Sequence, residues 1–307
     1  MSAIFRIGLV GVGRMGRTHL RALASSDAVR VVAVVEPVAA VRDALDAPGV
    51  SVHADLDAML RAGGIDGVLV AAPSDRHLAI VRRLAAAEMP ILCEKPCGVT
   101  EAQAHEAAAI AAAEKTPLQI AYWRRYVPAL RRLRERIAGG EMGNVYCVAC
   151  YQWDGAPPSA EFRAGSGGIF VDMGVHEFDQ VRWMTGQEIV RLHAVSATVG
   201  TPSLPAGETE SAQAVCMLSG GSTAIVSLGQ SFPLGDVCRV EVFGSGDAED
   251  CRFLWPPHTD TSFHDALRRQ AEAFVRRVGG ALTDGATAAD AVAALRAAEQ
   301  ARVALKQ

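Results

Sequence analysis

A lysine, an aspartate and a histidine stand at positions where they could carry out acid–base chemistry. Lys95 follows a short apolar run and precedes Pro96, whose ring would fix the backbone beside the lysine. Asp172 and His176 are four residues apart in a segment with a helical pattern, so we expect them on one stripe of a helix together with Asp179. A carboxylate one turn from an imidazole can orient the ring and favour its protonated form. This equipment is typical of general acid–base catalysis.

Structural readings of the same residues are also open. Lys95 could form a surface ion pair with Glu94, and Asp172 and His176 could pair only for the local stability of a helix. A histidine and a carboxylate at helical spacing can also bind zinc, but a zinc site needs further ligands. The sequence offers neither an H-E-x-x-H motif nor a suitably spaced pair of cysteines. We therefore expect no metal site.

A glycine-rich loop follows the first predicted strand. Gly11, Gly13 and Gly16 have the G-x-G-x-x-G spacing that allows a tight turn and the close approach of a pyrophosphate to a helix N-terminus. The second strand ends in Glu36, about 20 residues further on, where a carboxylate can accept hydrogen bonds from a ribose diol. A glycine turn that only packs a helix on a sheet is the alternative. Glu36 would repel a 2′-phosphate and the next two residues include no arginine, so we expect NAD rather than NADP.

The residues that we predict to bind the cofactor lie near the carboxyl ends of predicted strands, where doubly wound folds hold their ligands. They are Gly11, Val12, Gly13, Arg14, Met15, Gly16, Glu36, Pro73, Ser74, His77, Glu94 and Lys95. His19, on the first predicted helix, could also approach the cofactor. For His19 and His77 a purely structural role is equally open.

The first part of the chain has the sequence pattern of a parallel sheet. Up to residue 121, short apolar runs alternate with alanine-rich stretches, and this pattern predicts βαβ units. The expected strands are residues 6–10, 29–35, 67–72, 90–93 and 118–121. A helix is expected over 100–115, opening with the capping-box spacing of Thr100 and Gln103.

The second part of the chain is different. A basic helical segment is expected over 124–137, and most of its arginines should form a solvated face. Alternating runs at 145–152, 191–199, 212–218, 223–229 and 237–244, with a hairpin signal at 219–222, predict a mostly antiparallel sheet. Two helices, over 263–278 and 286–306, should close the chain and could pack on either domain.

The expected fold class is therefore α/β. A Rossmann domain with a doubly wound parallel sheet should bind NAD over residues 1–121. An α+β domain with a large, mostly antiparallel open sheet should bind substrate and form oligomer contacts over residues 122–307.

Composition limits the class of partner. The formal net charge of −4 and the pI of about 6.1 give no overall attraction to nucleic acid or to an anionic membrane, so we expect a small-molecule partner. Seven scattered cysteines, an odd number, favour a reducing compartment over a disulfide framework. No apolar stretch approaches the ~18 residues needed to cross a bilayer. We therefore expect a cytoplasmic protein.

Three motifs together resemble the Gfo/Idh/MocA oxidoreductase family over essentially the whole chain. They are the glycine loop, the Glu-Lys-Pro turn at 94–96, and the pattern G-G-x-x-x-D-x-x-x-H-x-x-D that starts at Gly167. The runs Tyr122-Trp123-Arg124-Arg125-Tyr126, Asp154-Gly155-Ala156-Pro157-Pro158 and Glu161-Phe162 resemble the inositol 2-dehydrogenase branch.

The resemblance implies hydride transfer between NAD(P) and a ring carbon that bears a hydroxyl. It implies that Lys95 contacts the reacting hydroxyl and the cofactor, that Asp172 binds substrate and orients the histidine, and that His176 takes the alcohol proton. The substrate-binding residues that it implies are Trp123, Arg124, Asp154, Arg163, Asp172 and His176. It also implies an open sheet that mediates homodimers or homotetramers.

The expected substrate is a cyclic polyol, most simply myo-inositol, which would give the 2-keto inosose. The chain departs from the inositol enzymes in the loop 233–236 and is shorter near 255–257, and the cluster of Arg124, Arg125 and Arg163 would also suit an anionic substrate. A dehydrogenase of a sugar or modified sugar is therefore the first alternative. A non-catalytic NAD-bound regulator and a glycosidase that uses tightly held NAD are alternatives of other classes.

Overall fold

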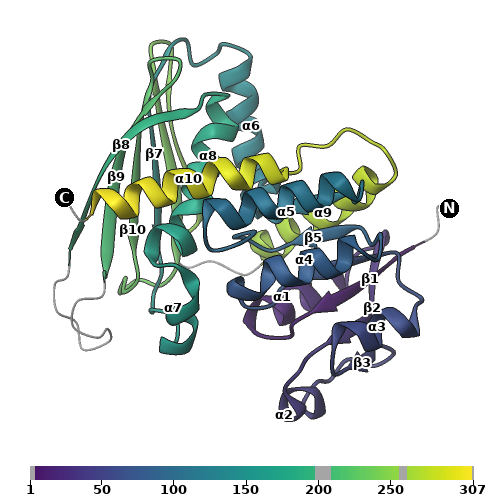
Figure 1. The fold of residues 1–307 in the computed structure, drawn as a ribbon. Helices are drawn as coiled ribbons and strands as arrows, with labels where there is room; N and C mark the ends of the chain where they lie inside the picture. Colours follow the sequence, from purple (N-terminus) through teal and green to yellow (C-terminus); the bar gives the residue numbers. More distant parts are fainter. Residues whose placement is uncertain (1–3, 198–208, 256–260, 306–307) are drawn as a thin grey trace. The chain divides into compact units, whose positions relative to one another are not determined.

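The computed structural model describes residues 4–197, 209–255 and 261–305. The chain divides into two compact units (Figure 1). Among the described residues, the first unit contains those up to 98 together with 102–123 and 263–289. The second unit contains 99–101, 124–262 and the residues from 290 onward.

The first unit is built on a six-stranded parallel sheet with the order β3-β2-β1-β4-β5-β6. Its strands are β1 Phe5–Val10, β2 Val29–Val35, β3 Ser51–His53, β4 Gly67–Val70, β5 Ile91–Cys93 and β6 Leu118–Ile120. The helices that accompany them are α1 Arg14–Leu23, α2 Ala39–Asp43, α3 Leu56–Ala62, α4 His77–Ala85, α5 Glu101–Ala113 and α9 Thr261–Val278. This strand order is that of a Rossmann fold, so the predicted doubly wound sheet is confirmed.

The core of the first unit includes residues from a distant part of the chain. Ile7 and Leu9 of β1 and Leu69 of β4 are buried, as expected for central strands that are covered on both faces. Phe274 of α9 joins this cluster, and its ring meets that of Phe5 edge to face at a centroid distance of 6.1 Å. The helix α9 is therefore an integral part of the first unit.

The second unit contains a six-stranded sheet with the order β12-β11-β7-β10-β9-β8. Its strands are β7 Val145–Trp153, β8 Ile189–Ala197, β9 Ser211–Leu218, β10 Thr223–Gly229, β11 Val237–Gly244 and β12 Ala248–Leu254. The neighbours β7 and β10 are parallel and all the other pairs are antiparallel. The predicted, mostly antiparallel sheet is confirmed, and so is the hairpin, where the Leu218 N–H donates to the Ser222 carbonyl at 2.9 Å.

Helices cover one face of this sheet (Figure 1). The unit contains α6 Pro128–Ala138, α7 Ala160–Ser166 and α8 Val175–Thr185, and α10 Ala288–Ala304 closes the described chain. Buried residues such as Cys216, Val226 and Val240 point to one side of their strands, and exposed residues alternate with them. The sheet therefore has one covered face and one open face.

Several predicted boundaries were wrong. The basic helix begins at Pro128 rather than at residue 124, because a 3₁₀ turn over Trp123–Tyr126 precedes it and proline suits the first turn of a helix. The last helix begins at Ala288 rather than at residue 286, because the Ala286 carbonyl accepts from the Ile120 N–H. Residues 198, 199, 256, 257 and 306, which fell in predicted features, lie outside the described residues.

Candidate active site

The glycine loop has the geometry that a dinucleotide requires. Gly11 adopts a φ of +92°, and a Cβ on Gly16 would lie 2.0 Å from the Gly11 carbonyl oxygen, so both positions need glycine. A Cβ on Gly13 would meet no atom within 4 Å, which leaves open space at the N-terminus of α1. No side chain caps this helix end. The first and third glycines are thus required by packing, and the middle one lies where a pyrophosphate can approach.

Glu36 is the buried acid at the end of β2. Its carboxylate accepts the main-chain N–H of Val12 at 3.2 Å and that of Val38 at 3.0 Å. It therefore holds the glycine loop against the second strand, a role that the sequence analysis did not anticipate. Its predicted contact with a ribose diol remains a prediction.

An arginine missed in the sequence analysis lies beside Glu36. Arg42 of α2 donates from Nη1 to the carbonyl oxygens of Glu36 and Pro37, both at 2.8 Å. It is six residues away along the chain, beyond the two positions that were considered, and the turn into α2 brings it back. A guanidinium beside Glu36 could attract the 2′-phosphate that distinguishes NADP from NAD.

The other predicted cofactor residues of the first unit follow the carboxyl ends of its strands, in loops or in the first turns of helices. Arg14 is exposed and Met15 is half-buried in the first turn of α1. Pro73 is exposed and Ser74 is buried after β4. His77 is buried and both of its ring nitrogens face main-chain carbonyls, so any contribution to cofactor binding would come through those loops rather than through a ring nitrogen.

Lys95 stands on a buried turn. Glu94 continues the pairing of β5 with β4 by donating its N–H to the Val70 carbonyl at 2.8 Å, and the Lys95–Pro96 bond is cis. Glu94, Pro96 and Cys97 are buried, whereas Lys95 is half-buried. The Glu94 carboxylate accepts the Lys95 main-chain N–H at 3.2 Å and lies 2.6 Å from the ring of His19. Glu94 is thus an interior residue and not half of a surface ion pair.

Asp172 and His176 do not lie on one regular α-helix. Asp172 belongs to a π-helical turn, Phe170–Gly174, and His176 belongs to the first turn of α8. A π-turn, with its i→i+5 hydrogen bonds, has more residues per turn than an α-helix, so the predicted stripe with a constant period of 3.6 residues was wrong. Both side chains are nearly buried, with 8% exposure for Asp172 and 7% for His176. Turns of this kind are frequent at functional sites.

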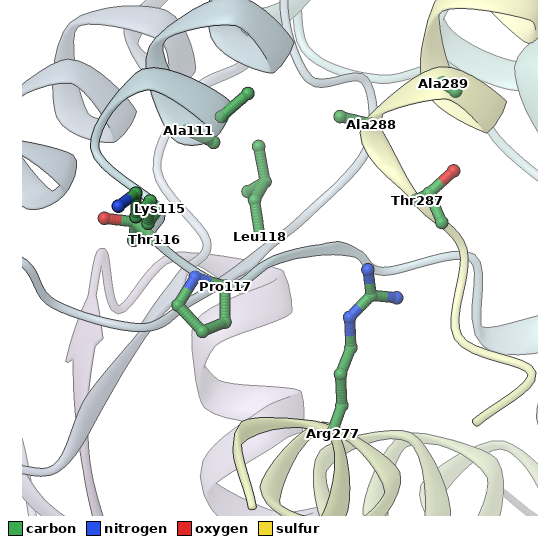
Figure 2. A pocket seen from close by; sticks show the side chains of 10 residues that line it. Ala111, Lys115, Thr116, Pro117, Leu118, Arg277, Thr287, Ala288 and Ala289 are labelled. Carbon is green, nitrogen blue, oxygen red and sulfur yellow. The ribbon is translucent and has the colours of Figure 1, made fainter. Parts of the chain in front are cut away.

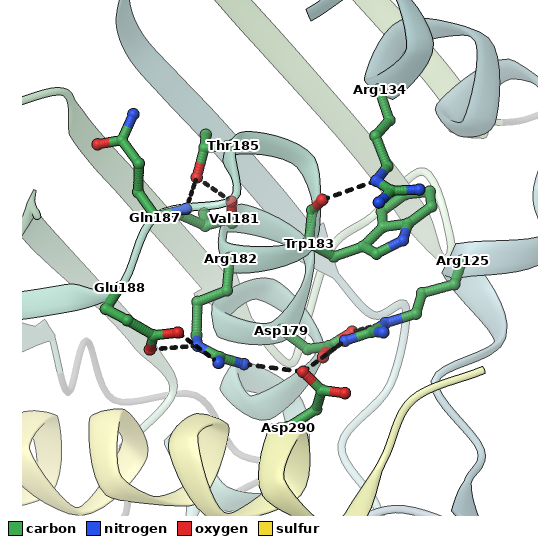
Figure 3. Close-up of polar contacts among 10 residues, drawn as sticks. All are labelled: Arg125, Arg134, Asp179, Val181, Arg182, Trp183, Thr185, Gln187, Glu188 and Asp290. Atoms are coloured by element: carbon green, nitrogen blue, oxygen red, sulfur yellow. Dashed lines mark hydrogen bonds and ion pairs between the residues drawn. The ribbon is translucent and has the colours of Figure 1, made fainter. Parts of the chain in front are cut away.

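Asp179, the third acid of the predicted stripe, belongs to an ion-pair network (Figure 3). Its carboxylate accepts from Nε of Arg125 at 2.9 Å, and Arg125 also lies 3.2 Å from Asp290. Arg182 extends the network from Asp290 to Glu188. Burial raises the pKa of Asp179 and the neighbouring Arg125 opposes that change. The Asp179 carboxylate is therefore engaged in an ion pair with Arg125.

Arg124, a predicted substrate residue, is buried as well, and so is its neighbour Arg125. The Arg124 guanidinium pairs with Glu177 and lies 5.4 Å from the ring centre of Phe253. It also donates to the side-chain oxygen Oε1 of Gln152 at 2.7 Å, and the side-chain Nε2 of Gln152 donates to the Asp154 carboxylate at 3.1 Å. The predicted substrate residues Arg124 and Asp154 are thus linked through Gln152, which the sequence analysis missed.

Two further predicted substrate residues occupy different settings. Trp123, in the first unit, is 8% exposed and packs edge to face on Phe263 at 4.7 Å. Arg163, on α7 of the second unit, is half-buried and donates to the Pro158 carbonyl. Direct contact of either residue with substrate remains a prediction.

A pocket of about 490 Å³ lies elsewhere in the first unit (Figure 2). Lys115 and Arg277 are the charged residues that line it, and Leu118 at its wall is the first residue of β6. No predicted site residue lines it. Because ligands of doubly wound sheets bind at the carboxyl ends of strands, this pocket at the amino end of β6 is not the cofactor site.

Two absences concern the described ranges alone. Residues 4–197, 209–255 and 261–305 contain no cluster of three histidine, cysteine or acidic side chains that could hold a metal ion. Over the same ranges, every helix is too short or too polar to cross a membrane.

Family models match both units of the chain. The model of the oxidoreductase family with an NAD-binding Rossmann fold covers residues 5–122, and the model of the GFO/IDH/MocA C-terminal domain covers residues 130–247. The chain belongs to the Gfo/Idh/MocA family. It is an oxidoreductase whose first unit is an NAD-binding Rossmann domain, and the glycine loop and Glu36 fit that cofactor.

Individual relatives in the Gfo/Idh/MocA family span nearly the whole chain. The rhizopine catabolism protein MocA of Rhizobium meliloti is 49% identical over 97% of this chain and 94% of its own length. Inositol 2-dehydrogenase of R. meliloti strain 1021 is 30% identical over 96% of this chain and 95% of its own. The structure of scyllo-inositol dehydrogenase from Lactobacillus casei with bound NAD(H) and scyllo-inositol has a TM-score of 0.88, with 25% identity over 99% of this chain and 97% of that one.

Proposed function

We propose that this oxidoreductase oxidises a ring secondary hydroxyl of a cyclic polyol with NAD. An inositol is the first candidate substrate, and myo-inositol would give the 2-keto inosose. The observation that carries the proposal is Lys95, a half-buried lysine held on a buried turn at the carboxyl end of β5, within the same unit as a glycine loop that fits a dinucleotide. The relatives named as inositol dehydrogenases support the substrate class.

Each proposed catalytic residue has one task. Bound NAD⁺ supplies the acceptor for the hydride that leaves the ring carbon. His176 accepts the proton of the hydroxyl, so that the C–O bond becomes a carbonyl, and later passes this proton to solvent. Lys95 donates to the same oxygen and stabilises the negative charge that develops on it. Asp172 holds the substrate and orients the imidazole.

Glu36 and Arg42 act in opposite directions on cofactor choice. The carboxylate of Glu36 stands where the ribose diol is expected and would repel a 2′-phosphate. Arg42 could attract one, but its Nη1 already donates to two main-chain carbonyls. NAD is therefore the proposed cofactor. NADP should support turnover at a much lower kcat/KM, and Glu36→Ala should narrow the difference between the two cofactors.

A compound of rhizopine catabolism is the second candidate substrate, because the relative at 49% identity is named for that process. The loop 233–236 departs from the pattern of the inositol enzymes, and this favours a substrate that differs from theirs. In the second unit, Asp236 of this loop accepts the Gly155 N–H at 2.8 Å, next to Asp154. A sugar or modified sugar would be recognised by the same kind of site.

The test is NADH formation by the purified protein with NAD or NADP and a panel of myo-, scyllo- and chiro-inositol, rhizopine and simple aldoses. We expect turnover of one ring polyol with NAD. Lys95→Ala should abolish it while NAD still binds, and loss of NAD binding instead would reject the catalytic role. Bound NAD with no oxidation across the panel would favour the regulator, and product release without net NADH would favour the glycosidase.

We also propose that the protein is a homo-oligomer that uses the open sheet face of the second unit. Apolar side chains on this face are exposed: Val195 on β8, Val215 and Met217 on β9, Ile225 on β10 and Phe243 on β11. The register places Met217 opposite Thr223, Thr223 opposite Cys147 and Cys147 opposite Phe243, so these residues belong to one face. Light scattering after size exclusion would give the mass, and Val215→Glu with Ile225→Glu should yield monomers.

A further inference from the structure

Two buried histidines hold the turn that carries Lys95. His19 lies on α1 with no exposed surface, and its Nε2 is 2.6 Å from Oε1 of Glu94. His77 is the first residue of α4 and is 1% exposed. Its Nδ1 lies 2.8 Å from the Pro96 carbonyl oxygen. The histidines therefore contact the residues immediately before and after Lys95.

The contacts on the Glu94 side fix a carboxylate. One Glu94 oxygen faces the His19 ring and the other accepts the Lys95 main-chain N–H at 3.2 Å. An ionised carboxylate only accepts hydrogen bonds, so Nε2 of His19 carries the proton that is shared. His19 thus holds Glu94, and Glu94 holds the backbone of Lys95.

The contacts on the Pro96 side join two loops. The second ring nitrogen of His77, Nε2, lies 2.8 Å from the carbonyl oxygen of Ala72, which follows β4. The ring therefore bridges the loop after β4 and the turn after β5. Pro96 has no N–H with which to anchor itself, so its carbonyl is the backbone group available for such a contact.

We propose that His19 and His77 are positioning residues for Lys95. This inference rests on the proposed function, in which Lys95 meets the reacting hydroxyl. Burying an imidazole costs free energy unless its nitrogens are paired, and an aliphatic side chain would fill the same volume without that cost. The two imidazole rings therefore serve to fix the position of the Lys95 side chain. Such precision matters because a displacement of about 1 Å at a catalytic group can lower the rate by roughly a hundredfold.

The kinetic test compares apolar and conservative variants in the full-length protein. His19→Leu and His77→Leu remove the contacts, whereas His19→Gln and His77→Gln retain an N–H donor. We expect each leucine variant to lower kcat by roughly tenfold to a hundredfold with little change in NAD affinity, and each glutamine variant to recover most of kcat. His105→Leu, at an exposed position on α5, is the matched control. NAD affinity is measured by titration in the absence of substrate.

A second measurement needs no substrate. The chain has three lysines, Lys95, Lys115 and Lys306, so reductive ¹³C-methylation gives few NMR signals, and Lys95→Arg identifies the signal of Lys95. With NAD bound, the Lys95 signal should shift or broaden in both leucine variants and match the wild type in the His105→Leu control. The Lys115 signal should stay constant throughout. This measurement decides the inference even if no polyol is oxidised.

The outcomes separate the inference from the proposed function. An unchanged Lys95 signal in folded leucine variants would overturn positioning, and so would a loss of NAD affinity that accounts for the whole fall in rate. An equal fall in kcat for leucine and glutamine variants with an unchanged Lys95 signal would show a role in packing alone. If the Lys95 signal moves as expected but no substrate is turned over, positioning stands and the proposed reaction fails.

Discussion

Arg124 and Glu177 form an ion pair inside the second unit, with side-chain exposures of 4% and 0%. Burial raises the pKa of Glu177 and the Arg124 guanidinium lowers it, so each charge depends on its partner. The pair also anchors a path to the candidate site, because Arg124 contacts Gln152 and Gln152 contacts Asp154. Substitutions at the ion pair should therefore lower the stability of the protein, whereas a substitution at Gln152 should weaken substrate binding.

Removing one charge of this pair should destabilise the protein. Glu177→Leu leaves the buried guanidinium without its carboxylate, and we expect the free energy of unfolding to fall by about 3–5 kcal/mol. The double variant Arg124→Met with Glu177→Leu should recover most of that loss, since no charge is left unpaired. Urea unfolding measures both. Equal losses in the single and double variants would contradict the argument.

Removing the middle of the path should affect substrate binding. Gln152→Leu breaks the link from Arg124 to Asp154 without leaving a buried charge unpaired. We expect KM for the polyol to rise by roughly tenfold, equivalent to about 1.4 kcal/mol, with kcat nearly unchanged. Gln187→Leu, a change of the same type at a turn of the second unit away from these residues, is the control. An unchanged KM would show that Asp154 needs no support from Gln152.

The glycine loop gives two alanine variants with opposite expectations. Gly16→Ala places a methyl group 2.0 Å from the Gly11 carbonyl oxygen, so the loop must move and thermal stability should fall. Gly13→Ala meets no protein atom within 4 Å, so stability should be kept while the approach of the pyrophosphate is obstructed. Thermal unfolding with and without NAD distinguishes them. If NAD raises the unfolding temperature of Gly13→Ala as much as that of the wild type, the proposed pyrophosphate site at the glycine loop is rejected.

His77 should make the protein less stable in acid. Burial lowers its pKa below the ordinary value of 6.5, and the carbonyls of Pro96 and Ala72 offset only part of that change. As pH falls through about 6.5, the unfolded chain binds a proton that the folded protein does not, so the free energy of unfolding decreases by up to about 1.4 kcal/mol per pH unit. Above that pH the ring is neutral in both states, so His77 causes no such loss of stability. His77→Gln should show a shallower slope in urea unfolding between about pH 6.5 and pH 5.5.

The buried cysteines should resist alkylation in the folded protein. Burial raises the pKa of Cys216 and Cys238 to about 12 and that of Cys251 to about 11, so little thiolate forms near neutral pH. Iodoacetamide with peptide mass analysis should label these three residues slowly in the native protein and rapidly in guanidinium. Rapid labelling in the native state would show that the sheet of the second unit opens easily.

Sequence pattern alone was enough for the central strands. The strands at 29–35, 223–229 and 237–244 have the predicted bounds, because each combines β-branched residues with burial in the middle of a sheet. The strands β3 and β12 were missed. Both lie at sheet edges, β3 has three residues, and β12 carries Glu249, Asp250 and Arg252, which hide any apolar alternation.

The sequence pointed to candidate catalytic residues but not to the residues that hold them in place. Lys95, Asp172 and His176 stand in short motifs, whereas Glu177 and Asp179, the carboxylates that pair with Arg124 and Arg125, are more than 50 residues away along the chain. A local run of arginines is the same whether it faces water or a buried carboxylate, so the expected solvated face could not be corrected from sequence. The contact between His19 and Glu94, 75 residues apart, was hidden for the same reason.

The place of α9 in the first unit affects the order in which the protein can be completed during synthesis. Phe274 packs against β1, yet residues 124–262 are translated between the last strand of that sheet and the helix. At ordinary elongation rates the ribosome needs roughly ten seconds or more for this insertion. The nascent Rossmann sheet must therefore wait with part of its apolar face uncovered, and the first unit to emerge is not finished until nearly the whole chain has been made.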